Sequence, residues 1–225
     1  MASIARQWIR HWLLPQTSEP RTVRLGLLRG IKLFMDPRSG LQNQYGLAER
    51  ELHPWFRKFS RDAKTAIDLG AAEGDYTLYY LKKTPAEKVI AFDCQEHCRV
   101  ALHQNLALNG LDGDPRVQVV GKFVGSALND GEVSLDDFLP QIQTPCVIKM
   151  DVERNEYPVL MGCPELLKLK DVRWIIEIHT PELDVLCRDL LEKNGYRVTS
   201  IQPAWWRRFI SETRGDYIRW MAASK

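Results

Sequence analysis

Residues that could do chemistry gather first between positions 65 and 93 of the 225-residue chain. A short apolar run ends at Asp68, a glycine-rich turn follows at 69–74, and a second apolar run ends at Asp93 after a helix-like segment. Glycines let the backbone approach a ligand closely, and a helix N-terminus offers free N–H groups. An acid after the second strand can accept hydrogen bonds from both hydroxyls of a ribose. This order predicts a nucleotide-type cofactor site.

The spacing of the glycines argues against a dinucleotide. The dinucleotide fingerprint requires glycine at its first, third and sixth positions, whereas a match begun at Gly70 meets Ala72 and then Asp75. Asp75 would also repel a pyrophosphate. The pattern Asp-Leu-Gly-Ala-x-x-Gly at 68–74 instead resembles motif I of class I S-adenosylmethionine (SAM) methyltransferases. SAM carries no phosphate, and its ammonium and sulfonium groups tolerate nearby carboxylates. The alternative is an ordinary βαβ unit whose glycines only make a tight turn.

Polar residues also follow the next three predicted strands, where ligands bind in open α/β sheets. Residues 121–126 follow the third strand, at the position of an adenine pocket, and residues 149–153 follow the fourth. Glu177 and His179 follow the fifth. Such groups are hard to explain as core packing, because buried carboxylates are costly unless paired or functional. The predicted cofactor-binding residues are Asp68, Gly70, Ala71, Ala72, Glu73, Gly74, Asp93, Cys94 and Val124.

Three downstream segments carry a more specific resemblance. Residues 133–139 read VSLDDFL, residues 147–162 read VIKMDVERNEYPVLMG, and residues 175–179 read IIEIH. With motif I, they resemble the FkbM family of SAM-dependent methyltransferases over about 42–198. The resemblance implies a Rossmann-like fold, SAM as cofactor and methyl transfer to a hydroxyl oxygen. The sequence departs from the family pattern at three places. It has Arg154-Asn155 where the family usually has Gly-Ala, Ala72 where the family often has Asn, and Asp93 where the family more often has Glu.

The predicted catalytic residues are those after the fourth and fifth strands. An alcohol acceptor must be aligned for in-line displacement and must lose its proton. Asp151 is the first choice for the general base or orienting acid, with Glu153, Glu177 and His179 as alternatives. Lys149 would pair with an acid or stabilise a developing alkoxide. The alternative for Lys149, Glu153 and Glu177 is a structural ion-pair network beneath the site.

The same residues could also bind a metal ion. Asp151, Glu153, Glu177 and His179 could together ligate a divalent cation that holds a diol or enolate acceptor. A second candidate, Cys94-x-x-His97-Cys98, lacks a partner cluster with zinc spacing and coincides with the predicted ribose position, so it is not favoured.

Composition bounds the remaining function classes. The chain is 44% hydrophobic and 27% charged with a net charge of +2, which indicates a globular domain and gives no general case for a nucleic-acid partner. No apolar run approaches the roughly 20 residues of a membrane span. Arg6, Arg10 and His11 interrupt any signal-like apolar segment. Five cysteines without framework spacing indicate reduced thiols, and therefore a cytoplasmic protein.

The elements that must position these residues alternate from residue 65 onward. Strands separated by helices predict an α/β fold with a doubly wound, mostly parallel, Rossmann-like sheet. A last strand at 217–222 is expected to lie antiparallel to the strand before it. The expected strands are 66–69, 89–92, 117–120, 147–150, 174–178 and 196–201, and the expected helices are 75–83, 95–109, 157–160 (extending through 169) and 181–194.

The region ahead of residue 65 is expected to be an accessory extension. A helix over 1–14, a β-hairpin of 22–28 with 31–35, and a helix over 45–60 are expected. We therefore divide the chain into an N-terminal accessory helix, hairpin and cap at 1–60 and a SAM-binding methyltransferase domain at 61–225.

The predicted function is methylation of a hydroxyl on a small molecule or glycan. The alternatives are a SAM-binding scaffold without catalysis, favoured only by the Arg154-Asn155 pair, and a nucleic-acid methyltransferase, for which the basic-aromatic residues 205–208 could stack bases. Residues 1–14 could contact a membrane surface or a partner, and exposed tryptophans would suit a homo-oligomer.

Overall fold

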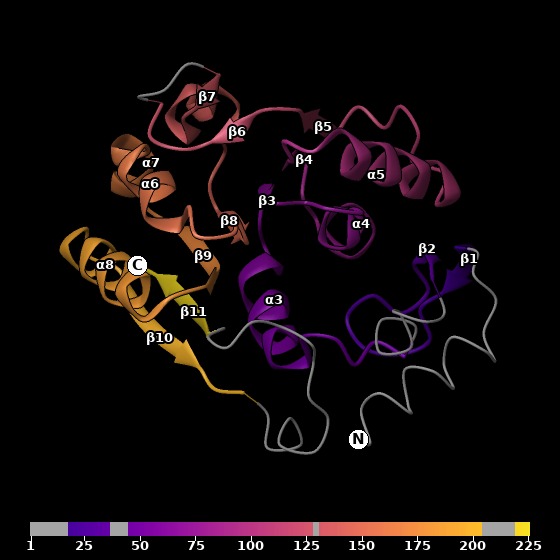
Figure 1. Ribbon diagram of the computed structural model, residues 1–225, viewed down its shortest axis with the longest axis horizontal. Coiled ribbons are helices and arrows are strands. Elements are labelled where there is room, and N and C mark those ends of the chain that lie inside the picture. The colour runs from indigo at the N-terminus through magenta and orange to yellow at the C-terminus, as the bar shows by residue number, and fades with distance from the viewer. Residues whose placement is uncertain (1–17, 37–44, 128–130, 204–218) are drawn as a thin grey trace, which may run out of the picture.

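The computed structural model describes residues 18–36, 45–127, 131–203 and 219–225 (Figure 1). The expected helix over 1–14 and the basic-aromatic residues 205–208 lie outside the described residues. Within the described part of the chain, no helix combines the length and the apolar character that a membrane span needs.

A seven-stranded sheet forms the centre of the molecule, and the predicted mostly parallel α/β fold is confirmed. Its strand order is β10-β11-β9-β8-β3-β4-β5, and β11 alone runs antiparallel to its neighbours. The antiparallel pairing of the last strand with the strand before it is also confirmed. The strands are β3 (Thr65–Leu69), β4 (Lys88–Phe92), β5 (Val117–Val120), β8 (Cys146–Met150), β9 (Val172–Ile178), β10 (Arg197–Ile201) and β11 (Arg219–Ser224).

Helices cover both faces of this sheet, because alternate strand residues point to opposite sides. Ala66 faces α3 (His53–Ser60), α4 (Asp75–Lys83) and α5 (Glu96–Leu108), and its neighbour Ile67 faces the other layer. That layer holds α6 (Glu156–Met161), α7 (Pro164–Lys168), α8 (Pro181–Lys193) and the 3-10 helix η2 (Leu135–Gln141). Figure 1 shows the two helix groups on either side of the strands. The two apolar layers hold the carboxyl ends of β3, β4, β8 and β9 together along one edge.

Two sequence predictions need correction in detail. The segment 157–169 is not one helix but α6 and α7, because the chain bends where Gly162 packs against the backbone of Gly125. A Cβ on Gly162 would lie 2.2 Å from the carbonyl oxygen of Gly125, and Pro164 then opens α7 at a position that suits proline. Residues 45–60 give only a short 3-10 helix, η1 (Arg50–Leu52), followed by α3.

The N-terminal hairpin exists, but its strands are β1 (Glu19–Thr22) and β2 (Lys32–Met35). Residues 23–28 form the connection instead of a strand, and Val23 and Leu27 are buried in the core. Two short strands that sequence patterns did not predict, β6 (Phe123–Val124) and β7 (Glu132–Val133), pair beside η2.

The described residues ahead of position 61 share the core of the main unit. Phe56 and Phe59 belong to the same buried cluster as Ala66. The backbone of β2 is held by α5, since the N–H groups of Lys32 and Phe34 donate to the side-chain oxygens of Asn109 (3.1 Å) and Asn105 (2.8 Å). The division of the chain at residue 60 stays a prediction.

Candidate active site

The loop between β3 and α4 lies directly against the carboxyl end of β8. The N–H groups of Gly70 and Ala71 both donate to the carbonyl oxygen of Phe92, at 3.0 and 2.9 Å. Gly70 has a φ of +70°, and a Cβ placed on it would lie 1.8 Å from the carbonyl oxygen of Asp151. Only glycine fits this position without displacing backbone. The loop and Asp151 therefore form one continuous wall.

Asp93 follows β4 and faces this loop. Its Oδ2 accepts the N–H of Ala72 at 2.8 Å, and its Oδ1 accepts the N–H of Gln95 at 2.9 Å. Each carboxylate oxygen keeps a second lone-pair site, so the group can still accept hydroxyl donors from a ligand. Ala72 itself has a φ of +46°. That left-handed backbone suits asparagine better than alanine.

Two neighbouring clefts meet at this wall. The first, which we call the donor cleft, opens beside Asp93 and is lined by Cys94, Cys98, Phe123 and Val124 among others. The second, the acidic cleft, is lined by Glu49, Ala71, Glu73, Asp75, Tyr76 and Lys149 among others. Gly70, Ala72, Cys98 and Asp151 line both. The structure thus brings Gly70–Glu73, Asp93, Cys94 and Val124 to two adjoining surfaces.

Asp68 and Gly74 lie behind the loop and line neither cleft. Asp68 is only 1% exposed, and its Oδ2 accepts the hydroxyl of Thr77 at 2.7 Å. Burial raises the pKa of Asp68, although Lys149 and Thr77 oppose that rise. Gly74 packs against Leu102 at the start of α4. Both residues therefore help to hold the loop, and the direct cofactor contact expected for them from the sequence stays a prediction.

The acidic cleft favours a positively charged occupant. Burial, with the nearby carboxylates of Glu73 and Glu49, raises the pKa of Asp75 to about 7. Burial also raises the pKa of Glu73. The hydroxyl of Tyr76 donates to Glu49 across the cleft. A cation in this cleft would relieve the repulsion among three carboxyl groups.

Lys149 connects the loop to the acids below it. Its ammonium donates to the carbonyl oxygen of Gly70 at 2.8 Å and lies 3.7 Å from a carboxylate oxygen of both Asp68 and Asp151. Burial alone would lower the pKa of Lys149, but the charges of Asp151 and Asp68 raise it overall. Lys149 therefore links the loop to Asp68 and Asp151 at the wall between the two clefts, and its catalytic role stays a prediction.

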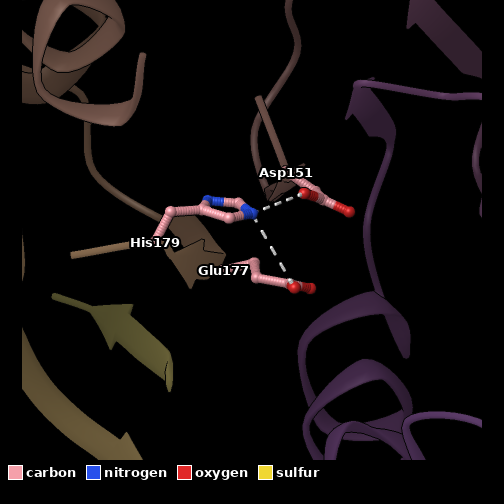
Figure 2. A group of neighbouring side chains, drawn as sticks. All are labelled: Asp151, Glu177 and His179. Atoms are coloured by element: carbon pink, nitrogen blue, oxygen red, sulfur yellow. Dashed lines mark ion pairs between the residues drawn. The ribbon is translucent and has the colours of Figure 1, made fainter. Parts of the chain in front are cut away.

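The remaining predicted residues converge on His179, just beyond β9 (Figure 2). Its Nε2 lies 3.7 Å from Oδ1 of Asp151, 3.6 Å from Oε2 of Glu153 and 3.9 Å from Oε1 of Glu177. Its Nδ1 contacts the carboxylate of Glu156. The hydrogen bond with Glu156 raises the pKa of His179, and Asp151 and Glu153 add to that effect while burial opposes it.

Glu156 is the site residue that sequence reasoning missed. It is fully buried, at 0% exposure, and its carboxylate contacts the imidazole of His179 and accepts the backbone N–H of Arg154. The signal was present, because Glu156 is the second glutamate of the segment 147–162 that carries the family resemblance. Its partner, His179, lies 23 residues further along the chain, and no local sequence pattern predicts their contact.

The Arg154-Asn155 departure does not disrupt the turn after β8. Glu153 and Arg154 adopt left-handed conformations, with φ of 42° and 71°. The N–H of Asn155 donates to the carbonyl oxygen of Val152 at 3.1 Å, and the side chain of Asn155 donates to the carbonyl oxygen of Val124 at 2.7 Å. An arginine thus occupies a backbone conformation that favours glycine, and Asn155 adds a contact with the wall of the donor cleft.

Comparison with known families agrees with this geometry. Residues 128–198 match the family model of the methyltransferase FkbM domain. The resemblance to FkbM-family methyltransferases predicted from the sequence is therefore confirmed over residues 128–198. The matched residues include the turn after β8, Glu156 and His179. No curated protein matches the chain.

Solved methyltransferase structures share the fold of this chain. A methyltransferase FkbM from Methylobacillus flagellatus aligns with a TM-score of 0.57 at 19% identity over 72% of this chain, but over only 44% of that chain. A precorrin-6y C5,15-methyltransferase from Geobacter metallireducens gives 0.55 at 16% identity, covering 79% of this chain and 88% of that one. A SAM-dependent O-methyltransferase from Thermotoga maritima gives 0.54 at 15% identity, covering 79% and 65%. The Rossmann-like methyltransferase fold is therefore confirmed.

Proposed function

We propose that this FkbM-type methyltransferase uses SAM to methylate a hydroxyl group of a small molecule or glycan. The observation that carries the proposal is the continuity of the two clefts with the acids around His179. Gly70 and Asp151 line both clefts, and Asp151 is also 3.7 Å from His179. A cofactor held along this wall has carboxylates and an imidazole beside it.

The residues present fit the cofactor. Asp93 retains acceptor capacity for ribose hydroxyls, and Val124 and Phe123 offer an apolar surface for an adenine. The acidic cleft, where Glu73 and Asp75 have raised pKa values, suits an ammonium group. When bound, SAM supplies an electrophilic methyl group on a sulfonium.

The chain's own residues would orient the acceptor and receive its proton. Asp151 is the first candidate, since it is partly exposed at the meeting point of the two clefts. Glu156 holds the imidazole of His179 from behind and directs Nε2 toward Asp151. A base is needed for an alcohol acceptor, which is why this acid-rich end supports oxygen as the methylated atom.

The test of cofactor binding is the change Asp93→Ala, with Asp112→Ala as a matched control in an exposed loop. Losing two hydrogen bonds to a charged acceptor should weaken SAM binding on the order of 100-fold. Isothermal titration calorimetry measures the affinity, and circular dichroism checks that the fold is kept. Equal SAM affinity in the Asp93 and Asp112 variants would remove the proposed cofactor site.

The test of catalysis is a panel of hydroxyl-bearing acceptors with methyl-labelled SAM, comparing the wild-type chain with Asp151→Ala. Label transferred by the wild type and lost in the variant supports the proposal. Label transferred only to RNA or DNA would show a nucleic-acid acceptor. Binding of SAM without any transfer would support the scaffold alternative.

The surroundings of the enzyme belong to the same proposal. We expect a cytoplasmic protein, in keeping with five free thiols. No nucleic-acid partner is expected. Contact with a membrane surface or partner through residues 1–14, and homo-oligomerisation, stay predictions that light scattering and vesicle sedimentation of the full chain can check.

A further inference from the structure

We propose that Asp151, Glu177 and His179 bind a divalent cation of the first transition row, such as Mn²⁺ or Zn²⁺. One ligand atom from each of these three side chains lies within 4.8 Å of the other two. They come from the ends of β8 and β9 and point toward one another in Figure 2. The cation site stands on this cluster, whereas its use in acceptor binding rests on the proposed function.

The distances around His179 suit a shared ion better than direct contacts. Its Nε2 is 3.7 Å from Asp151 and 3.9 Å from Glu177, beyond the range of hydrogen bonds between these groups. Two atoms that each bind one ion at about 2.1 Å lie about 3.0 Å apart at right angles and about 4.2 Å apart when opposite. Both separations from Nε2 fall inside that range.

The imidazole is held as metal-binding histidines are held. Its side chain is only 10% exposed, and Nδ1 contacts the buried carboxylate of Glu156. Among the described residues, Nε2 forms no hydrogen bond and points at the two carboxylates. A metal-ligating histidine usually donates its other ring N–H to a carboxylate in this way. This buried nitrogen aimed into the cluster is an observation separate from the acids themselves.

The charge around the cluster also calls for a cation. Four carboxylates surround His179, those of Asp151, Glu153, Glu156 and Glu177. The ammonium of Lys149 lies beside this group, 3.7 Å from Asp151. Several like charges in a poorly hydrated site are costly unless a cation balances them.

The ligand types indicate which ion. One imidazole with two carboxylates suits Mn²⁺ or Zn²⁺ better than Ca²⁺ or Mg²⁺, which prefer oxygen ligands alone. An ion there would have positions left for acceptor oxygens and would lower the pKa of a coordinated hydroxyl. Glu153, which is 87% exposed and outside the three ligands, lies beside them at 3.6 Å from Nε2 of His179. The acceptor class that this arrangement fits is a compound with two adjacent oxygens.

The experiment titrates metal-free full-length chain with Mn²⁺, followed by electron paramagnetic resonance and calorimetry, and repeats the titration with Zn²⁺. We expect one ion per chain, with binding weakened at least about tenfold in Asp151→Asn, Glu177→Gln and His179→Gln. The matched controls Asp112→Asn and His103→Gln are exposed and should bind as the wild type does. Thermal unfolding of each variant confirms that it is folded.

Two results would overturn the proposal. One is a chain that binds neither ion while still binding S-adenosylhomocysteine, which would leave the cofactor proposal intact. The other is equal ion affinity in the wild type and in all three folded site variants, which would place any bound ion elsewhere. Conversely, ion binding by a chain that does not bind S-adenosylhomocysteine would support the cation site and contradict the proposed function.

Discussion

Replacing Gly70 by alanine tests the contact between the donor loop and β8. The added Cβ would lie 1.8 Å from the carbonyl oxygen of Asp151, and φ at this position is +70°. A left-handed residue with a Cβ costs about 1–2 kcal/mol, and forcing atoms into a packed region costs about 1–3 kcal/mol more. Alanine recovers about 0.4–1 kcal/mol by restricting the unfolded chain. The expected net loss in the free energy of unfolding is about 1–5 kcal/mol.

Gly113→Ala is the matched control. Gly113 has the same φ of +70°, but nothing lies within 4 Å of a Cβ placed there. Its substitution should therefore cost only the backbone strain, about 0–1.6 kcal/mol after the unfolded-state gain, and so about 1–3 kcal/mol less than Gly70→Ala. Urea unfolding followed by tryptophan fluorescence gives both values, and calorimetry should show that Gly70→Ala also loses SAM binding. If both variants lose the same stability, the close approach of Gly70 to Asp151 is not a constraint.

Two further predictions concern stability. Arg154 is exposed and has a φ of +71°. Arg154→Gly should therefore stabilise the chain by about 0.5–1 kcal/mol, whereas Arg154→Ala, which keeps the Cβ, should not. Thermal unfolding compares the two variants, and equal melting temperatures would contradict the assigned strain. Asp75 has a pKa of about 7 in the folded chain against an ordinary 3.8, so the folded state holds this proton more tightly and stability falls as pH rises from about 4 to 7. Asp75→Asn should therefore match the wild type near pH 4 and exceed it above pH 7 by about 2–4 kcal/mol in urea unfolding, and a constant difference across that range would refute the assignment.

The sequence predicted the helices and strands that begin and end at residues close by in the sequence. The helix expected over 75–83 is α4 with the same bounds, because a glycine turn precedes it and residues beyond Lys83 cannot continue it. The strand expected over 117–120 is β5. The sequence patterns also placed Gly70, Asp93 and Asp151 directly after three strands, and the structure brings the three residues to one cleft. This was predictable because parallel strands place their carboxyl ends along one edge of the sheet.

Features that depend on distant contacts were not predictable. The break between α6 and α7 arises where Gly162 meets Gly125, which is 37 residues earlier in the sequence. Asp68 reads as a cofactor ligand in sequence, yet its contacts with Thr77 and Lys149 bury it behind the loop. Glu156 belongs to the site because it contacts His179, which directly follows β9, and this contact between distant segments cannot be predicted from the sequence.

The position of β11 ties the stability of one sheet edge to the chemistry of the site. Among the described strands, β10 pairs only with β11, and β11 also pairs with β9. The indole N–H of Trp220 in β11 donates to Glu177 at 3.0 Å. Detachment of β11 would therefore release β10 and remove a hydrogen bond from Glu177 in a single step. Amide hydrogen exchange in β10 and β11 should therefore report on the same opening that disturbs the acids around His179. The site would then depend more on the stability of this edge of the sheet than on that of the opposite edge at β5.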